Sequence, residues 1–303
     1  MKSSNIGGQA VMEGVMMRNA DKYAVAVRKT DGEIVVKTEE YKGIVQNKKI
    51  RSLPIIRGVF SFIDSMVLGM STLTYSASFF MDEEEEEKDE KKESVMMGLT
   101  IACSVVMAVA ISMILPYFLS QLFRKFTDST TLITLLEGAV RLVIFFGYIL
   151  LISRMKDIQR VFMYHGAEHK CINCIEHGME LNVENVLKSS RLHKRCGTSF
   201  LFIVMIVSII FFLFIRIESP IWRVVFRLLL IPVIAGVSFE FIRLAGKSEN
   251  KLVILLSKPG MMLQKLTTRE PDASMAEVAI ASVEAVFDWR AYLKENFGWQ
   301  EKV

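Results

Sequence analysis

Two histidines and a glutamate stand close together in the middle of the chain, in the string YHGAEHK at 164–170. On a helix, His165 and His169 would lie on one face, because residues four apart are neighbours there. This spacing suits two imidazoles on one zinc-sized ion, and His-x-x-Glu-His is the inverted form of a zinc-protease motif. The motif therefore predicts a divalent metal site, for zinc, with Glu168 as the catalytic base for a metal-bound water. The alternative is a pair of solvated surface histidines.

A second polar cluster, HKRCGTS at 193–199, follows directly before an apolar stretch, so it can meet the first cluster at a membrane surface. An open, catalytic site would take its third ligand from His193, Cys196 or Glu176, the last lying eleven residues beyond His165 and close to three helical turns on. Such a site leaves one position for water. We assign the metal ligands as His165, His169, His193 and Cys196.

A closed, structural zinc site is the alternative. The residues Cys171, Cys174, His193 and Cys196 have a spacing that resembles a zinc ribbon. Zinc-ribbon cysteines usually sit on tight turns, whereas Cys171 and Cys174 fall inside a helical pattern. The pattern favours the open site.

Four further residues are candidates for a supporting or substrate-binding role. Glu13 and Arg18 are the charged residues of a glycine-rich N-terminal run, which could cover a pocket or bind a phosphate, or could form a well-packed turn. Glu176 shares the histidine face, and Glu240 lies near the predicted cytoplasmic end of the last apolar stretch.

The elements that carry these residues are mostly apolar and long. Stretches at about 95–118, 131–153, 199–217 and 222–244 meet the length of about 20 residues needed to span a bilayer. The segments 1–57, 154–198 and 243–303 carry 11, 8 and 9 Lys and Arg residues, against two in 119–130 and none in 218–221. The positive-inside rule then places the N-terminus, the His/Cys loop and the C-terminus in the cytoplasm.

The remaining segments predict a β-hairpin, an interfacial or re-entrant helix and two helices in the tail. The pattern at 23–37 reads as a β-hairpin with an Asp-Gly turn at 31–32, and 55–81 reads as an interfacial or re-entrant helix because charged and small residues interrupt it. In the tail, 252–266 is amphipathic, and Ser274 with Glu277 would open a helix that runs to about Leu293.

The predicted fold is mainly α: a multi-pass α-helical membrane protein with a small N-terminal β-hairpin unit and a cytoplasmic helical loop and tail. Its parts are 1–53 (glycine-rich and hairpin unit), 54–81 (interfacial or re-entrant helix), 82–93 (acidic linker), 94–153 (first transmembrane pair), 154–198 (His/Cys loop), 199–246 (second transmembrane pair) and 247–303 (amphipathic tail helices).

Composition excludes some functional classes. The net charge of +4 is spread along the chain without an arginine-rich block, which argues against nucleic-acid binding. Four irregularly spaced cysteines do not indicate a disulfide framework, and residues 1–18 do not read as a signal peptide.

The strings GGQAVMEGVMMR at 7–18, YHGAEHK at 164–170, RCGTSF at 195–200 and TTREP at 267–271 resemble the YqhQ-like family of bacterial membrane proteins. The resemblance covers nearly the whole chain. It implies a membrane protein of uncharacterised activity, usually described as a predicted metal-dependent enzyme. The family motif, as it maps here, includes His165, Glu168, His169, His193 and Cys196, but not Cys171 or Cys174.

Two functions from different classes fit these observations. The first is a metal-dependent hydrolase in the inner (cytoplasmic) membrane, acting at the cytoplasmic face on a membrane lipid or another membrane-associated substrate. The alternative is a non-enzymatic transport, channel or assembly protein, formed by several copies of the chain, in which the metal only holds the loop.

Overall fold

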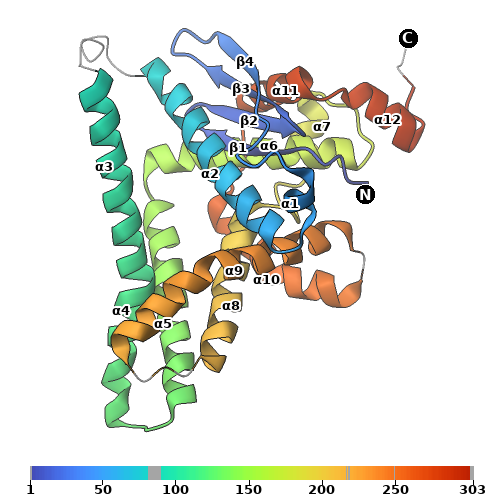
Figure 1. Cartoon of the computed structure of the whole chain (residues 1–303). Helices are drawn as coiled ribbons and strands as arrows, with labels where there is room; N and C mark the ends of the chain where they lie inside the picture. The colour runs from blue at the N-terminus through green and yellow to red at the C-terminus, as the bar shows by residue number, and fades with distance from the viewer. Residues whose placement is uncertain (1, 81–89, 216, 218, 249, 301–303) are drawn as a thin grey trace. The chain divides into compact units, whose positions relative to one another are not determined.

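The computed structural model in Figure 1 describes residues 2–80, 90–215, 217, 219–248 and 250–300. Within these residues the chain is mainly helical, with one four-stranded antiparallel sheet. It divides into two compact units, one formed by 1–80, 152–203 and 235–303, the other by 81–151 and 204–234. Most of the predicted acidic linker 82–93 lies outside the described residues.

The sheet of the first unit is a simple meander. Its strands are β1 (Gly7–Val11), β2 (Gly14–Asn19), β3 (Lys22–Arg28) and β4 (Ile34–Glu40), in the order β1-β2-β3-β4. The predicted hairpin is confirmed as β3 and β4, with Gly32 at φ +89° in its turn. The glycine-rich run, for which no strands were predicted, forms β1 and β2.

One face of the sheet packs on helices α6 (Lys156–Glu176) and α11 (Ala273–Val286) (Figure 1). Alternation along β2 and β3 directs Val15, Met17, Ala24 and Ala26 to this face, where they join one core with apolar residues of both helices. The short helices α7 (Val183–Lys188) and α12 (Trp289–Phe297) add residues to the same core. This packing fixes α6, which carries the candidate motif.

The opposite face of the sheet is covered by α2 (Ile56–Ala77), followed by the short helix η1 (Ser78–Phe80). Val11, Val25 and Val27 of this face pack with Leu68 of α2. The Gln9 side-chain amide donates to the Gly69 carbonyl at 3.4 Å, and the Met12 N–H donates to Ser76 Oγ at 3.1 Å. The first unit therefore has three layers, with the sheet between α2 and the pair α6 and α11.

The C-terminal helices differ in part from the predicted ones. Helix α10 (Lys251–Thr267) matches the amphipathic pattern. The helix predicted from Ser274 to Leu293 is wrong: Asp272 is the N-cap of α11, and a second helix, α12, begins after Asp288. Glu277 forms an ion pair with Arg28 and so does not complete a capping box. The acidic cap two residues upstream outcompetes the serine, since its carboxylate accepts the Met275 N–H at 2.9 Å.

The second unit is built from helices alone. Helix α3 (Glu90–Val109) continues through a π-helical turn (Ala110–Ile114) into α4 (Leu115–Gln121) and the short η4 (Leu122–Lys125), and α5 (Thr130–Ile152) follows. Helices α8 (Gly197–Phe214) and α9 (Pro220–Lys247) have residues in both units. The short α1 (Lys48–Ser52) belongs to the first unit.

The buried charges of the second unit form one cluster, in which a single carboxylate pairs with two guanidinium groups. Glu137 accepts hydrogen bonds from Arg141 at 3.1 Å and from Arg227 at 2.9 Å. Arg141 also donates to the Ser112 carbonyl at 2.8 Å and to Ser208 Oγ at 3.0 Å. These bonds join residues of α5, α8, α9 and the π-helical turn at Ala110–Ile114 within the second unit.

Five helical segments of the described residues are long and apolar enough to cross a bilayer: Ile56–Phe80, Gly98–Lys125, Thr130–Ile152, Gly197–Phe214 and Ile221–Gly246. The last four correspond to the predicted spans. The first corresponds to the predicted interfacial or re-entrant helix.

Candidate metal centre

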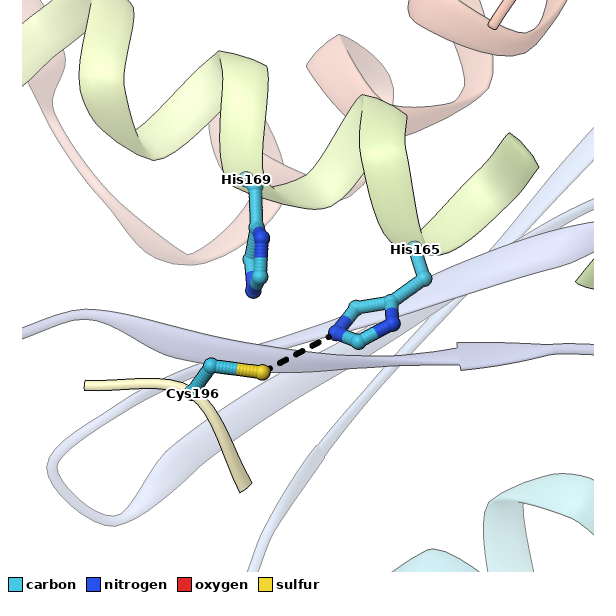
Figure 2. A group of neighbouring side chains, drawn as sticks. All are labelled: His165, His169 and Cys196. Carbon is cyan, nitrogen blue, oxygen red and sulfur yellow. Dashed lines mark hydrogen bonds between the residues drawn. The ribbon is translucent and has the colours of Figure 1, made fainter. Parts of the chain in front are cut away.

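His165, His169 and Cys196 come together at the surface of α6 (Figure 2). The helix places the two imidazoles one turn apart, with ring centroids 4.4 Å from each other. Cys196 comes from the loop that precedes α8, and its Sγ lies 3.3 Å from His165 Nε2. One ligand atom from each of the three residues lies within 4.8 Å of the other two. The three donors could therefore contact one ion.

Backbone carbonyls set the tautomer of both histidines. His165 Nδ1 lies 2.9 Å from the Thr267 carbonyl oxygen, and His169 Nδ1 lies 2.6 Å from the Arg191 carbonyl oxygen. A carbonyl only accepts, so each Nδ1 carries a proton and each neutral ring keeps its lone pair on Nε2. Metal-bound histidines in proteins are oriented by such bonds. Two imidazoles and one thiolate fit zinc in a site with three protein ligands.

The charges of the three residues depend on one another. Burial alone raises the pKa of a thiol, but the two imidazoles beside Cys196 lower its pKa well below the ordinary value. Burial lowers the pKa of His165, yet the Cys196 sulfur raises it to about 9. Cys196 is thus held as a thiolate, which is the form that binds metal.

Glu168 lies on α6 beside this group and is buried. Its Oε2 is 3.9 Å from His165 Nε2. Strand β1 passes directly over it, because a Cβ built on Gly8 would lie 2.9 Å from Glu168 Cγ and 2.6 Å from the Met16 carbonyl oxygen. Only glycine allows the strand to come this close.

His193 was predicted as a ligand, and the structure directs it elsewhere. Its Nε2 lies 3.3 Å from Glu176 Oε2, although its ring is 5.9 Å from the His169 ring. Glu176 is fully buried, forms an ion pair with Arg195 and accepts the Ser4 N–H at 2.7 Å. Burial raises the pKa of Glu176, but the hydrogen bond from His193 and the Arg195 charge outweigh it and lower the pKa to about 2. His193 and Glu176 thus form a buried pair beside the three-residue group.

The structure does not assemble the alternative four-ligand site. Cys171 and Cys174 belong to the hydrophobic core between α6 and α11. Burial raises the pKa of both thiols, that of Cys174 to about 12. Cys174 Sγ contacts the Glu180 carbonyl oxygen at 3.3 Å. Within the described residues, Cys196 is grouped with His165 and His169.

The other three candidates make contacts away from the group. Glu13 forms an ion pair with Arg160 and accepts the Tyr164 hydroxyl at 3.3 Å. Arg18 donates to the Ala20 carbonyl at 2.8 Å and lies over the Tyr41 ring. Glu240 forms an ion pair with Arg57 at the start of α2. The first two support the β1–β2 region, and the third joins α9 to α2.

The TTREP segment at 267–271, which from the sequence is only a link between the two tail helices and a family string, holds α6 in place. A Cβ built on Gly166 would lie 2.0 Å from the Arg269 carbonyl oxygen, so this glycine permits close packing of the segment. Arg269 N–H donates to the Phe162 carbonyl at 2.8 Å, and Glu270 forms an ion pair with Lys170 at 2.9 Å. Two features of the sequence could have shown this role. One is Gly166 inside the histidine motif, and the other is the polar TTREP segment, which ends in a proline.

A cavity of about 660 Å³ adjoins the three candidate ligands. His165, Glu168, His169 and Cys196 line it, together with β1 and mostly apolar side chains of α2, α6, α8 and α9. Its volume is in the range of about 300–1,000 Å³ that is common for ligand sites. The group is therefore accessible to a ligand of moderate size.

Comparison with known proteins gives a family without a known activity. The family described as "Protein of unknown function (DUF1385)" matches residues 53–289. The "Uncharacterized protein YqhQ" of Bacillus subtilis (strain 168) is 36% identical over 301 residues, which cover 96% of this chain and 94% of that protein. No solved structure matches the chain.

Proposed function

Because the chain belongs to this YqhQ-like family of proteins of unknown function, we propose its activity from the geometry of its own residues: a metal-dependent hydrolase in the cytoplasmic membrane. The observation that carries the proposal is the convergence of His165, His169 and Cys196, with each histidine Nδ1 on a backbone carbonyl, Nε2 left as the possible metal-binding nitrogen, and Glu168 beside them. A structural zinc site would more often close with four protein ligands, whereas three leave a position open.

Each residue of the candidate centre would have a separate role in the proposed hydrolysis. His165, His169 and Cys196 would hold the ion, which when bound supplies a Lewis acid and lowers the pKa of water. Glu168 would accept a proton from the attacking water and deliver it to the leaving group. The Thr267 and Arg191 carbonyls orient the two imidazoles, and the His193–Glu176 pair supports the loop that presents Cys196.

The proposed location is the cytoplasmic face of the membrane. Its support is the five apolar helices and the excess of Lys and Arg in 1–57, 154–198 and 243–303. Helix α2 covers the sheet of the first unit with Leu68 and bonds to it through Gly69 and Ser76. These contacts favour an interfacial position for α2, with the centre at the membrane surface and a substrate that is itself in the membrane.

Metal content is the first test. The purified full-length protein should carry about one zinc ion per chain, and the double variant His165→Ala/His169→Ala should lose it. An unchanged zinc content in the double variant would remove the basis of the proposal.

Catalysis is tested by Glu168→Gln. Membranes from a strain that lacks the protein are incubated with the purified zinc-loaded protein, and new products are identified by mass spectrometry. Glu168→Gln should keep its zinc and make none of these products, while Glu184→Gln, at an exposed position of α7, should make them all. Identical products from Glu168→Gln would favour the non-enzymatic alternative, in which the ion only stabilises the loop.

A further inference from the structure

Strand β1 has one edge that pairs with no described strand. It pairs with β2, while its other edge is open. Two-residue connections join β1 to β2 and β2 to β3, closing on the pairs Val11–Gly14 and Asn19–Lys22. In an antiparallel ladder, hydrogen-bonded pairs alternate along the strands, starting from the pair that closes such a hairpin. Gly8 and Ala10 therefore direct their N–H and C=O groups to the open edge.

These four groups lack partners in the part of the chain that the structure describes. No hydrogen bond joins the N–H or C=O of Gly8 or Ala10 to another described residue outside the sheet. Both residues are only half-buried, and both line the cavity. A half-buried backbone edge of this kind requires a hydrogen-bonding partner, either water or another strand.

The cavity beside this edge is flanked by helices on both faces of the sheet. Its apolar wall includes Phe62, Met66 and Met70 of α2, Phe162 of α6 and Phe200 of α8. Met66 and Met70 are exposed by 56% and 44% of their surface. Methionine side chains adapt to varied apolar partners. The wall therefore suits apolar side chains that alternate to either side of an added strand.

We propose that the substrate is an extended polypeptide segment with apolar side chains, which adds to the open edge of β1 as a fifth strand beside the candidate centre. Strand addition of this kind gives affinity through main-chain hydrogen bonds and specificity through pockets for alternate side chains. Cleavage of the segment rests on the proposed hydrolase, whereas its binding does not.

The reaction is then the hydrolysis of an amide bond. The water oxygen bonds to the carbonyl carbon, and the carbon–nitrogen bond breaks. Both water protons end on the leaving nitrogen, one of them by way of Glu168, so that the products at neutral pH are a carboxylate and an ammonium group.

A lipid hydrocarbon chain would fill the same apolar wall but would leave the edge unsatisfied. An alkyl chain offers no acceptor to the Gly8 and Ala10 N–H groups and no donor to their carbonyls. Displacing water from these groups without replacing its hydrogen bonds is unfavourable. The geometry therefore favours a peptide over a lipid.

The test uses peptides that carry backbone N-methyl groups. The probe is a hexapeptide of Ala, Leu, Val and Phe with a C-terminal amide, and its binding to the full chain in lipid nanodiscs is measured by calorimetry. N-methylation of two alternate amides should weaken binding about 25-fold, about fivefold for each lost hydrogen bond. N-methylation of the two intervening amides should change binding little. Equal effects in both registers would overturn the proposal.

A pair of proline variants tests the strand edge itself. Ala10→Pro removes an N–H from the open edge of β1 without removing a ladder bond, and edge strands tolerate proline at such positions. Val36→Pro is the matched control, because Val36 has the equivalent position on the opposite edge strand β4 and is exposed. Only Ala10→Pro should weaken peptide binding, again about fivefold or more. Equal affinity of the two variants would contradict edge pairing.

Hydroxamate probes separate this inference from the proposed function. Acetohydroxamate should bind the zinc-loaded protein, and the hexapeptide hydroxamate should bind at least tenfold more tightly. If the peptide amide shows alternation but no hydroxamate binds, the peptide site stands and the hydrolase fails. If acetohydroxamate binds and the peptide adds nothing, the hydrolase stands and the peptide inference fails. A straight-chain alkyl hydroxamate that binds as tightly as the peptide would identify a lipid site instead.

Discussion

Gly7 and Gly8 of β1 give a direct test of how the strand positions Glu168, the proposed catalytic base. In Gly8→Ala, the new Cβ would lie 2.6 Å from the Met16 carbonyl oxygen and 2.9 Å from Glu168 Cγ. One of these contacts is with backbone, so either the strand or the Glu168 side chain must shift. Overpacking of this kind lowers the free energy of unfolding by about 1–3 kcal/mol. A displacement of the base by about 1 Å lowers the rate of a positioned reaction by about 100-fold.

Gly7→Ala is the matched control. A Cβ at Gly7 meets nothing within 4 Å, and alanine loses less conformational entropy than glycine on folding. This variant should therefore be as stable as the wild type or slightly more stable. Thermal unfolding of the two variants in the same detergent, together with zinc content and product formation, gives the comparison. If Gly8→Ala matches Gly7→Ala in stability and rate, β1 does not press on Glu168 as described.

Three further predictions concern the metal, pH and topology. Cys171→Ser/Cys174→Ser should keep its zinc, because both thiols lie in the core, whereas Cys196→Ser should weaken zinc binding; a titration that gives the reverse order would support the zinc-ribbon alternative. The pKa of Glu176 is depressed to about 2 in the folded protein. Its contribution to the free energy of unfolding is therefore complete above the unfolded pKa of about 4.3 and disappears as pH falls to about 2. Glu176→Gln should flatten the pH dependence of unfolding in this window, and an unchanged profile would contradict the depressed pKa. A reporter inserted near Gly178 should register as cytoplasmic, and an external signal would reverse the proposed orientation.

The sequence predicts the histidine pair of the candidate centre better than it predicts the third ligand. The four-residue spacing of His165 and His169 depends only on helix geometry, and α6 places both on one face as expected. Cys196 could only be named among three candidates for the third position, because the path of the loop from α6 back to it is set by tertiary contacts. Glu176 was counted on the histidine face, but its buried carboxylate pairs with His193 and Arg195.

Dependence on tertiary contacts also explains the errors in the predicted fold. The hairpin β3–β4 was predictable from alternation and an Asp-Gly turn. Strands β1 and β2 were not, because glycine and methionine at 7–17 give no β-branched alternation. These strands form because β1 pairs with β2, β2 pairs with β3, and the sheet packs between α2 and α6. Asp272 and Ser274 both suit an N-cap, and the choice between them depends on the packing of α11 against the sheet.

The carbonyl of Thr267 has a consequence for the order in which the protein is built. This carbonyl holds the His165 ring from a segment 102 residues further along the chain, and Arg269 bonds to Phe162 in the same helix. Helices α8, α9 and most of α10 must therefore be synthesised before α6 receives its final support. During translation the two histidines emerge long before Thr267, so the nascent chain cannot present an oriented pair of imidazoles. The proposed metal uptake would therefore come late, when the chain is nearly complete and its last apolar helices have been made.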